Sequence, residues 1–182
     1  MIISIKLNLT FIFKCVIMKT FHKLDKHVIY LDELVLQVAS QMGQPEDLNC
    51  ASSAIDAVLR AVRNRLSFEQ SIKFLNLLPL PFKAVYIKDW NVNDHVPDRI
   101  DSMQDFIDEV HRLAPDLCSD RYQDNSVFKK AIKSVFKVIG LHVSNQDLKK
   151  ELLFLPDDLR IYLEAEGVSL KSNTLDTSIW LS

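Results

Sequence analysis

The sequence contains an internal duplication, and this feature constrains the fold more than any other. The segment that begins at Ala54 aligns without a gap with the segment that begins 77 residues later, at Ala131. Over the 34 pairs that end at Ile87 and Glu164, eight residues are identical, whereas unrelated segments match at about one position in fifteen. The identical pairs are Ala54/Ala131, Ile55/Ile132, Val58/Val135, Ser67/Ser144, Lys73/Lys150, Leu75/Leu152, Leu78/Leu155 and Pro79/Pro156. The duplication predicts two copies of one structural unit.

Each copy carries apolar residues at the spacing of an amphipathic helix. The first copy has Ile55, Val58, Leu59, Val62 and Leu66, and the second has Ile132, Val135, Phe136, Ile139 and Val143. Helices are expected from Asp32 to Met42 and from about Ser52 to Leu66. The chain has only three glycines, which is too few for a turn-rich sandwich or a phosphate-binding α/β fold. The sequence therefore predicts an all-α fold.

Ser67 is predicted to join two helices at a tight corner. Ser67 and Gln70 have the spacing of a capping box, in which the serine hydroxyl accepts a backbone N–H and the glutamine reaches back. Pro79 then ends the third helix and leads into a short fourth one. Ser144 and Pro156 repeat both features in the second copy. We therefore expect two pseudo-symmetric repeats of about four helices, packed as one helical bundle domain.

The helical domain is expected to span residues 31–166, with halves at 31–87 and 102–166. Residues 1–30 are interpreted as an amino-terminal extension, and residues 167–182 as a carboxy-terminal tail. Ile3 to Phe11 alternate between apolar and polar residues as a strand does, and we expect Met18 to be the true start. Neither half is expected to be stable alone, because its short helices would leave an apolar face uncovered.

Charge and cysteine usage predict a cytoplasmic location. No apolar run is long enough for a signal peptide or a membrane span. Cys15, Cys50 and Cys118 are widely spaced, so free thiols in a reducing compartment are expected. The formal net charge of −2 gives no field that attracts nucleic acid or anionic lipid.

The order of residues around the end of the first copy is specific. It includes the segment from Ala57 to Ser67, then Leu78, Pro79, Phe82, Lys83, Tyr86, Trp90, Pro97, Ser102, Phe106 and Val110. Over roughly residues 31–166 the chain resembles an uncharacterised bacterial family, domain of unknown function 2267. The resemblance implies a small cytosolic all-helical domain, without an established activity or catalytic residues. Asp89 stands where the family usually has glycine before the tryptophan, so this turn is expected to differ locally.

No residue pattern predicts a catalytic, cofactor or metal site. None of the five histidines lies four residues from another histidine or cysteine, so no helical metal pair forms. Glycine-rich phosphate loops and the motifs of serine hydrolases and zinc proteases are absent from the sequence. The carboxylate pairs Asp108–Glu109 and Asp157–Asp158 are expected at or near helix starts, where they balance the helix dipole. We predict that the protein is not an enzyme and uses no cofactor.

Basic side chains on the two second helices form a candidate nucleic-acid face. They are Arg60 and Arg63 in the first copy and Lys133 and Lys137 in the second. The helix, serine corner and helix around them superficially resemble a helix-turn-helix. Overall acidity and the lack of aromatic residues among the basic ones favour an ordinary solvated face.

Trp90 and Tyr86 are the candidate anchors for a protein partner, because aromatic residues are enriched at interface hot spots. The simpler interpretation is that Trp90 seals the core where the connector leaves the first copy. We predict a non-enzymatic interaction or regulatory module that binds an unknown protein partner. The alternatives are a nucleic-acid-associated helical protein and, third, an enzyme of unknown reaction.

Overall fold

The computed structural model describes residues 31–91, 97, 99–117 and 125–168. These residues form helices joined by short connections, and none of them is in a strand. The all-α prediction is therefore confirmed. A helix at residues 31–41 comes first. It is followed by α2 (Leu48–Arg65), α3 (Phe68–Leu77), α4 (Leu80–Ile87), α5 (Met103–Leu113), α6 (Asn125–His142), α7 (Asn145–Leu152) and α8 (Asp157–Ala165).

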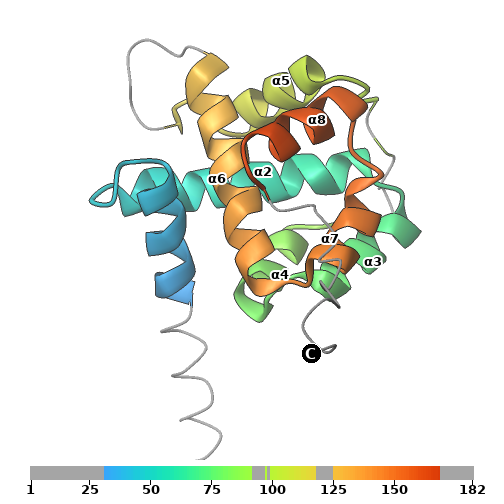
Figure 1. The fold of residues 1–182 in the computed structure, drawn as a ribbon, viewed down its shortest axis with the longest axis horizontal. Coiled ribbons are helices and arrows are strands. Elements are labelled where there is room, and N and C mark those ends of the chain that lie inside the picture. Colours follow the sequence, from blue (N-terminus) through green and yellow to red (C-terminus); the bar gives the residue numbers. More distant parts are fainter. Residues whose placement is uncertain (1–30, 92–96, 98, 118–124, 169–182) are drawn as a thin grey trace, which may run out of the picture.

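Helix α2 lies at the centre of the packing (Figure 1). It contacts α4, α5 and α6, while α3 packs beside α7 and α5 packs against both α6 and α8. The helix at residues 31–41 lies at the edge of the body, beside the first turns of α2 (Figure 1). The first helix and the beginning of α2 therefore form a border of the molecule.

Side-chain caps set the starts of α2, α3 and α7. Helix α2 begins four residues before the predicted Ser52, because the carboxylate of Asp47 caps it by accepting from the Cys50 N–H at 2.8 Å. At the predicted corner, the Ser67 hydroxyl accepts from the Gln70 N–H at 3.3 Å and the Gln70 side chain accepts from the Ser67 N–H at 2.9 Å. The capping box is thus confirmed, and Ser144 caps α7 from the corresponding position.

The helix bounds of the two copies follow the duplication. Helices α2 and α6 both span 18 residues, and their first and last residues are each displaced by 77 positions. The first residues of α3 and α7, and those of α4 and α8, are displaced by the same interval. The repeat is therefore present in the secondary structure. A pseudo-twofold relation of the two halves in space stays a prediction.

One hydrophobic core joins all the described helices. It includes Leu34 from the first helix, Phe74 from α3 and Phe82 from α4, each at most 1% exposed. The two long helices supply their complete predicted stripes apart from Val143, which is half-buried. Val168, which the sequence placed in the tail, is also buried, and its N–H donates to the Leu163 carbonyl at 3.0 Å.

Three turns use the left-handed region of the backbone. Gly43 and Gly167 follow the ends of the first helix and of α8, and have φ of 69° and 76°. Asp89 also adopts a positive φ of 52°. A side chain with a Cβ is disfavoured there, although aspartate tolerates this region better than most residues.

Asp89→Gly is therefore expected to stabilise the fold by about 0.5–1 kcal/mol, because glycine adopts a positive φ without a steric penalty. Asp89→Ala is the matched control and should lower stability instead. Urea unfolding followed by circular dichroism measures both. A loss of stability in the glycine variant would show that the Asp89 side chain contributes more than its backbone conformation costs.

Of the amino-terminal segment and the three cysteines, the structure describes Cys50 alone. The alternating segment from Ile3 to Phe11, the proposed start at Met18, and Cys15 and Cys118 all lie outside the described residues. Cys50 is described, and it is disulfide-bonded. The expectation of a free thiol is therefore wrong for Cys50. The cysteine spacing could not reveal this, because pairing depends on distances in the folded chain.

Within the described ranges, no helix combines the length and the apolar character that a bilayer crossing requires.

Candidate functional site

Arg63 is a buried cation at the junction of α2 and α4. It is 5% exposed, and its Nη1 donates to the carbonyl oxygens of Tyr86 at 2.6 Å and Lys88 at 2.9 Å. Its guanidinium carbon lies 5.8 Å from the centre of the Trp90 ring. Burial, and then the charge of Arg60, lower the pKa of Arg63 below its usual value. The guanidinium thus caps carbonyl groups at the end of α4 and makes a cation–π contact with the Trp90 ring.

Aromatic rings close this junction. The Trp90 ring lies 6.0 Å from Tyr86 and 5.9 Å from Phe68, and Tyr86 lies 5.6 Å from Phe74, measured between ring centroids. Tyr86 is fully buried, and its burial raises the pKa of its hydroxyl to about 12. Tyr86 is therefore a core residue here and offers no surface to a partner. Trp90 is half-buried against the core, and a role for it in binding stays a prediction.

The four predicted basic residues do not form a free basic face. Arg63 is buried at the junction, so its placement on the surface was wrong. Arg60 lies 3.4 Å from Asp56, and Lys133 lies 2.8 Å from Glu166. Lys137 is half-buried, and its charge helps to lower the pKa of Glu166 after the Lys133 hydrogen bond and charge. These contacts leave little unpaired charge for a nucleic acid.

The predicted carboxylate pairs have structural roles. Asp158 accepts from the Met103 N–H at 2.8 and 2.9 Å, so the start of α8 caps the start of α5. Asp108–Glu109 lies within α5, and the prediction that it sits near a helix start was wrong. Glu109 is 9% exposed and accepts from Asn64 at 2.7 Å and from Arg112 at 2.6 and 2.7 Å. This network ties α5 to α2.

Glu109 is expected to give stability that depends on pH. Burial alone raises the pKa of Glu109, but the hydrogen bonds from Arg112 and Asn64, with the Arg112 charge, bring it below its usual value. The resulting stabilisation is present above the unfolded carboxyl pKa of about 4.3 and is lost as the pH falls through the lower folded pKa. At neutral pH the free energy of unfolding of the wild type should exceed that of Glu109→Gln by about 1–2 kcal/mol. Urea unfolding at several pH values should show this difference vanish in acid; a constant difference would contradict the assignment.

A polar cavity of about 540 Å³ lies where the α2–α3 corner faces the start of α8. Its lining includes Arg65, Asp101, Asp157 and Asp158. Asp157 pairs with Arg160, Asp158 caps α5, and Asp101 lies 3.8 Å from Arg65. These groups already have structural partners, so we do not assign a ligand to this cavity.

A second surface depression is apolar, and we call it the apolar groove. It has a volume of about 570 Å³ and lies between the helix at residues 31–41, the first half of α2 and the end of α4. Leu36 and Leu48 on its sides are 48% and 42% exposed. Its lining residues are Leu31, Asp32, Val35, Leu36, Leu48, Ser52, Ile55 and Val85. Both its size and its apolar lining are typical of sites that bind ligands or peptide side chains.

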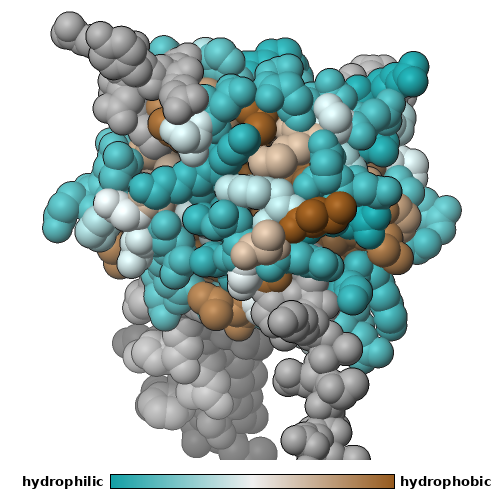
Figure 2. Space-filling view, turned by 45° about the horizontal axis from the view of Figure 1, so that its top comes forward, coloured by the Kyte–Doolittle hydropathy of each residue, from teal (hydrophilic) through white to brown (hydrophobic). Residues whose placement is uncertain are grey.

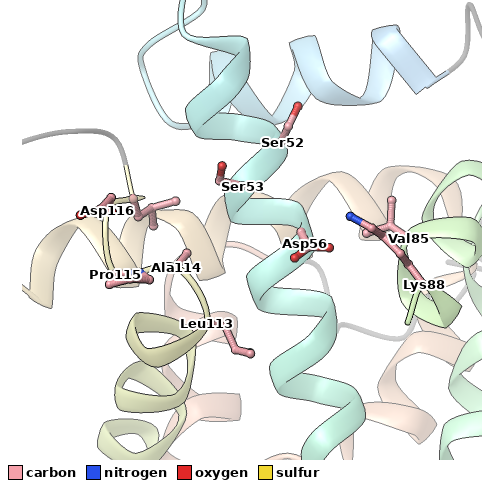
Figure 3. Close-up of a pocket in the computed structure, with 10 residues that line it drawn as sticks. Ser52, Ser53, Asp56, Val85, Lys88, Leu113, Ala114, Pro115 and Asp116 are labelled. Atoms are coloured by element: carbon pink, nitrogen blue, oxygen red, sulfur yellow. The ribbon is translucent and has the colours of Figure 1, made fainter. Parts of the chain in front are cut away.

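The apolar groove adjoins a polar hollow of about 490 Å³, because Ser52 and Val85 line both. Figure 3 shows this polar hollow between α2, the loop after α5 and the end of α4, with the amino end of Lys88 directed toward Asp56. Its lining residues are Ser52, Ser53, Asp56, Val85, Lys88, Leu113, Ala114, Pro115, Asp116 and Leu117. Apolar and charged groups therefore follow one another along a single surface.

Other exposed apolar residues lie on α3, α4, α6 and α8 and after α7. They are Phe68, Ile72, Leu80, Ile87, Leu141, Leu153 and Ile161. Figure 2 shows a mostly hydrophilic face on which hydrophobic side chains form separate spots. Dispersed apolar residues of this kind are normal for a protein surface, whereas a concave apolar lining points to binding.

Sequence reasoning missed the apolar groove, although one signal was present. Leu36 lies outside the apolar stripe of the first helix, so helical spacing predicts that it faces away from the core. That stripe consists of Leu31, Leu34, Val35, Val38 and Met42. Leu48 precedes the predicted start of α2, so the sequence pattern assigned it no helical face. The concave shape itself arises from the angle between two helices, which a stripe pattern does not specify.

Among the described residues, no three histidine, cysteine, aspartate or glutamate side chains are grouped as a metal site requires. The fold and these surfaces define a small all-helical domain with an internal repeat and an apolar groove at its border. The chain belongs to the family described as uncharacterized conserved protein (DUF2267), whose model matches residues 31–162. No curated protein matches the sequence.

Proposed function

We propose that this protein is an interaction module that binds a protein partner through the apolar groove and performs no catalysis. The observation that carries the proposal is a concave apolar lining with exposed leucines on both sides. Leu36 and Leu48 are already about half buried, so covering the rest of each side chain contributes about 1 kcal/mol, roughly half the value for complete burial of a leucine. An apolar segment of a partner would gain this energy on docking.

Two further observations support binding over catalysis. The best-partnered carboxylate, Glu109, holds two helices together, and the buried Arg63 caps a helix. Both of these charged groups are therefore explained by the fold. The nucleic-acid alternative stays a prediction, and the ion pairs of Arg60 and Lys133 do not favour it.

Selection from a displayed library of random peptides tests the proposal even while the natural partner is unidentified. Wild type should enrich peptides with apolar residues at helical spacing. The groove variant, which combines Leu36→Asp and Leu48→Asp, should not bind them. Ile161→Asp is the matched control, because Ile161 is an exposed apolar residue on α8, 67% exposed. Failure to enrich peptides, or equal binding by the groove variant, would overturn the proposal.

A cytoplasmic location stays part of our proposal, although the Cys50 disulfide does not favour it. Disulfides persist in oxidising compartments and are rare in the reducing cytosol. Cells are quenched in acid, and the protein is unfolded and alkylated before any reduction, because the Cys50 side chain is only 4% exposed in the fold. The disulfide of the structure predicts that Cys50 is alkylated only after reduction, which would count against a cytoplasmic location, whereas alkylation without reduction would support that location.

A further inference from the structure

The chemistry of the partner follows from the surface that continues the apolar groove. The polar hollow shares Ser52 and Val85 with it, so one bound segment can contact both. Asp32 lines the apolar groove, and Asp56 and Asp116 line the polar hollow, where Lys88 is the single cation among the lining residues. The lining of the two together is therefore acidic.

The carboxylates keep capacity for a ligand. Asp56 contacts Arg60 at 3.4 Å, but both side chains are partly exposed, at 30% and 37%. Asp32 and Asp116 are exposed. A carboxylate has about four acceptor sites, so the Arg60 ion pair and the nearby amino end of Lys88 do not exhaust Asp56.

We infer that the occupant is an amphipathic helical peptide whose apolar residues fill the apolar groove and whose lysine or arginine side chain enters the polar hollow. This inference rests on the proposed function and adds the charge of the partner to it. Helix-in-groove recognition uses apolar anchors at i, i+3, i+4 and i+7. A basic residue one or two turns beyond them would approach Asp56 and Asp116, because the polar hollow continues the apolar groove. Complementary charge selects the partner and its orientation.

The test uses three synthetic peptides of about 15 residues, long enough for helix formation. They share one apolar pattern and carry lysine, glutamine or glutamate at the flanking positions. Fluorescence anisotropy with the full chain should show the lysine peptide binding about tenfold more tightly than the glutamate peptide. The preference should shrink at high salt, because these charges are exposed.

Variants separate the polar hollow from the general acidity of the protein. Asp56→Asn with Asp116→Asn should remove most of the preference for lysine. Glu164→Gln, an exposed carboxylate on α8, should leave it unchanged. The inference would be overturned if the aspartate double variant and Glu164→Gln changed the preference for lysine equally. It would also be overturned if the wild type showed no preference among the three peptides.

The same titrations distinguish failure of the inference from failure of the proposed function. If all three peptides bind equally and Leu36→Asp abolishes binding, the apolar groove binds partners and only the inferred charge is wrong. If Leu36→Asp changes nothing, the proposed function is wrong as well. Sedimentation of the free protein adds a further outcome: a dimer that Leu36→Asp dissociates would make a second copy the occupant and overturn the inference.

Discussion

Phe136→Ala is expected to destabilise the whole protein by about 3–5 kcal/mol in a single unfolding transition. Phe136 is fully buried in α6, so truncation removes apolar contacts and leaves a cavity. This loss is a large part of the stability of a typical domain. Both copies contribute to one core, so the effect should not be confined to the second copy.

Leu59→Ala is the matched variant, because Leu59 occupies the corresponding position in α2 and is also fully buried. Leu59→Ala should lower the free energy of unfolding by about 2–5 kcal/mol, and unfolding should again occur in one transition. Urea unfolding followed by circular dichroism and by tryptophan fluorescence measures both variants. If Phe136→Ala fails to fold, Phe136→Leu provides the milder test. Two separate transitions, each shifted by only one variant, would contradict a shared core.

Arg63→Ala is the second large effect, at about 2–4 kcal/mol. The substitution deprives the Tyr86 and Lys88 carbonyls of their charged donor and removes the cation from the face of Trp90. The end of α4 should loosen, and the fluorescence of Trp90 should change with it.

Arg60→Ala is the control for Arg63→Ala. Arg60 lies on the same helix, but its ion pair with Asp56 is partly exposed. Its loss should cost within about 0.5 kcal/mol. Urea midpoints of the two variants give the comparison directly. Equal destabilisation would show that Arg63 acts as an ordinary surface residue.

The sequence predicted the helices and their corners because these are local features. The stripe that includes Val58 and Val135 needs only a period of 3.6 residues, and the Ser67 and Ser144 caps need only neighbouring residues. The predicted start of α2 was too late, because Asp47, which lies upstream of Ser52, was not recognised as the cap. Local signals thus specify element type better than element bounds.

The candidate site could not be predicted in the same way, because it depends on long-range packing. Arg63 looks like any solvated arginine in the sequence, and only the position of α4 turns it into a buried cap. Asn64 and Glu109 are 45 residues apart and reveal their contact only in the fold. The apolar groove likewise exists because the first helix meets α2 at the border of the core.

The duplication also clarifies where function can lie. Apart from the exposed pair Lys73 and Lys150, most positions shared by the two copies are packing or capping residues, such as Val58 with Val135 and Ser67 with Ser144. The apolar groove depends on the helix at residues 31–41, which precedes the aligned segments. The proposed binding site therefore combines this unduplicated helix with residues of the first copy, such as Ile55 and Val85.

Amide NMR spectra of the full chain, recorded while the lysine peptide is added, test the central claim most directly. Binding through the apolar groove predicts that shifts concentrate in residues 31–36 and 48–56 and at Val85. Residues around Ile161 on α8 should stay unchanged. Shifts that concentrate on α3 or α8, or the absence of shifts at saturating peptide, would contradict the claim.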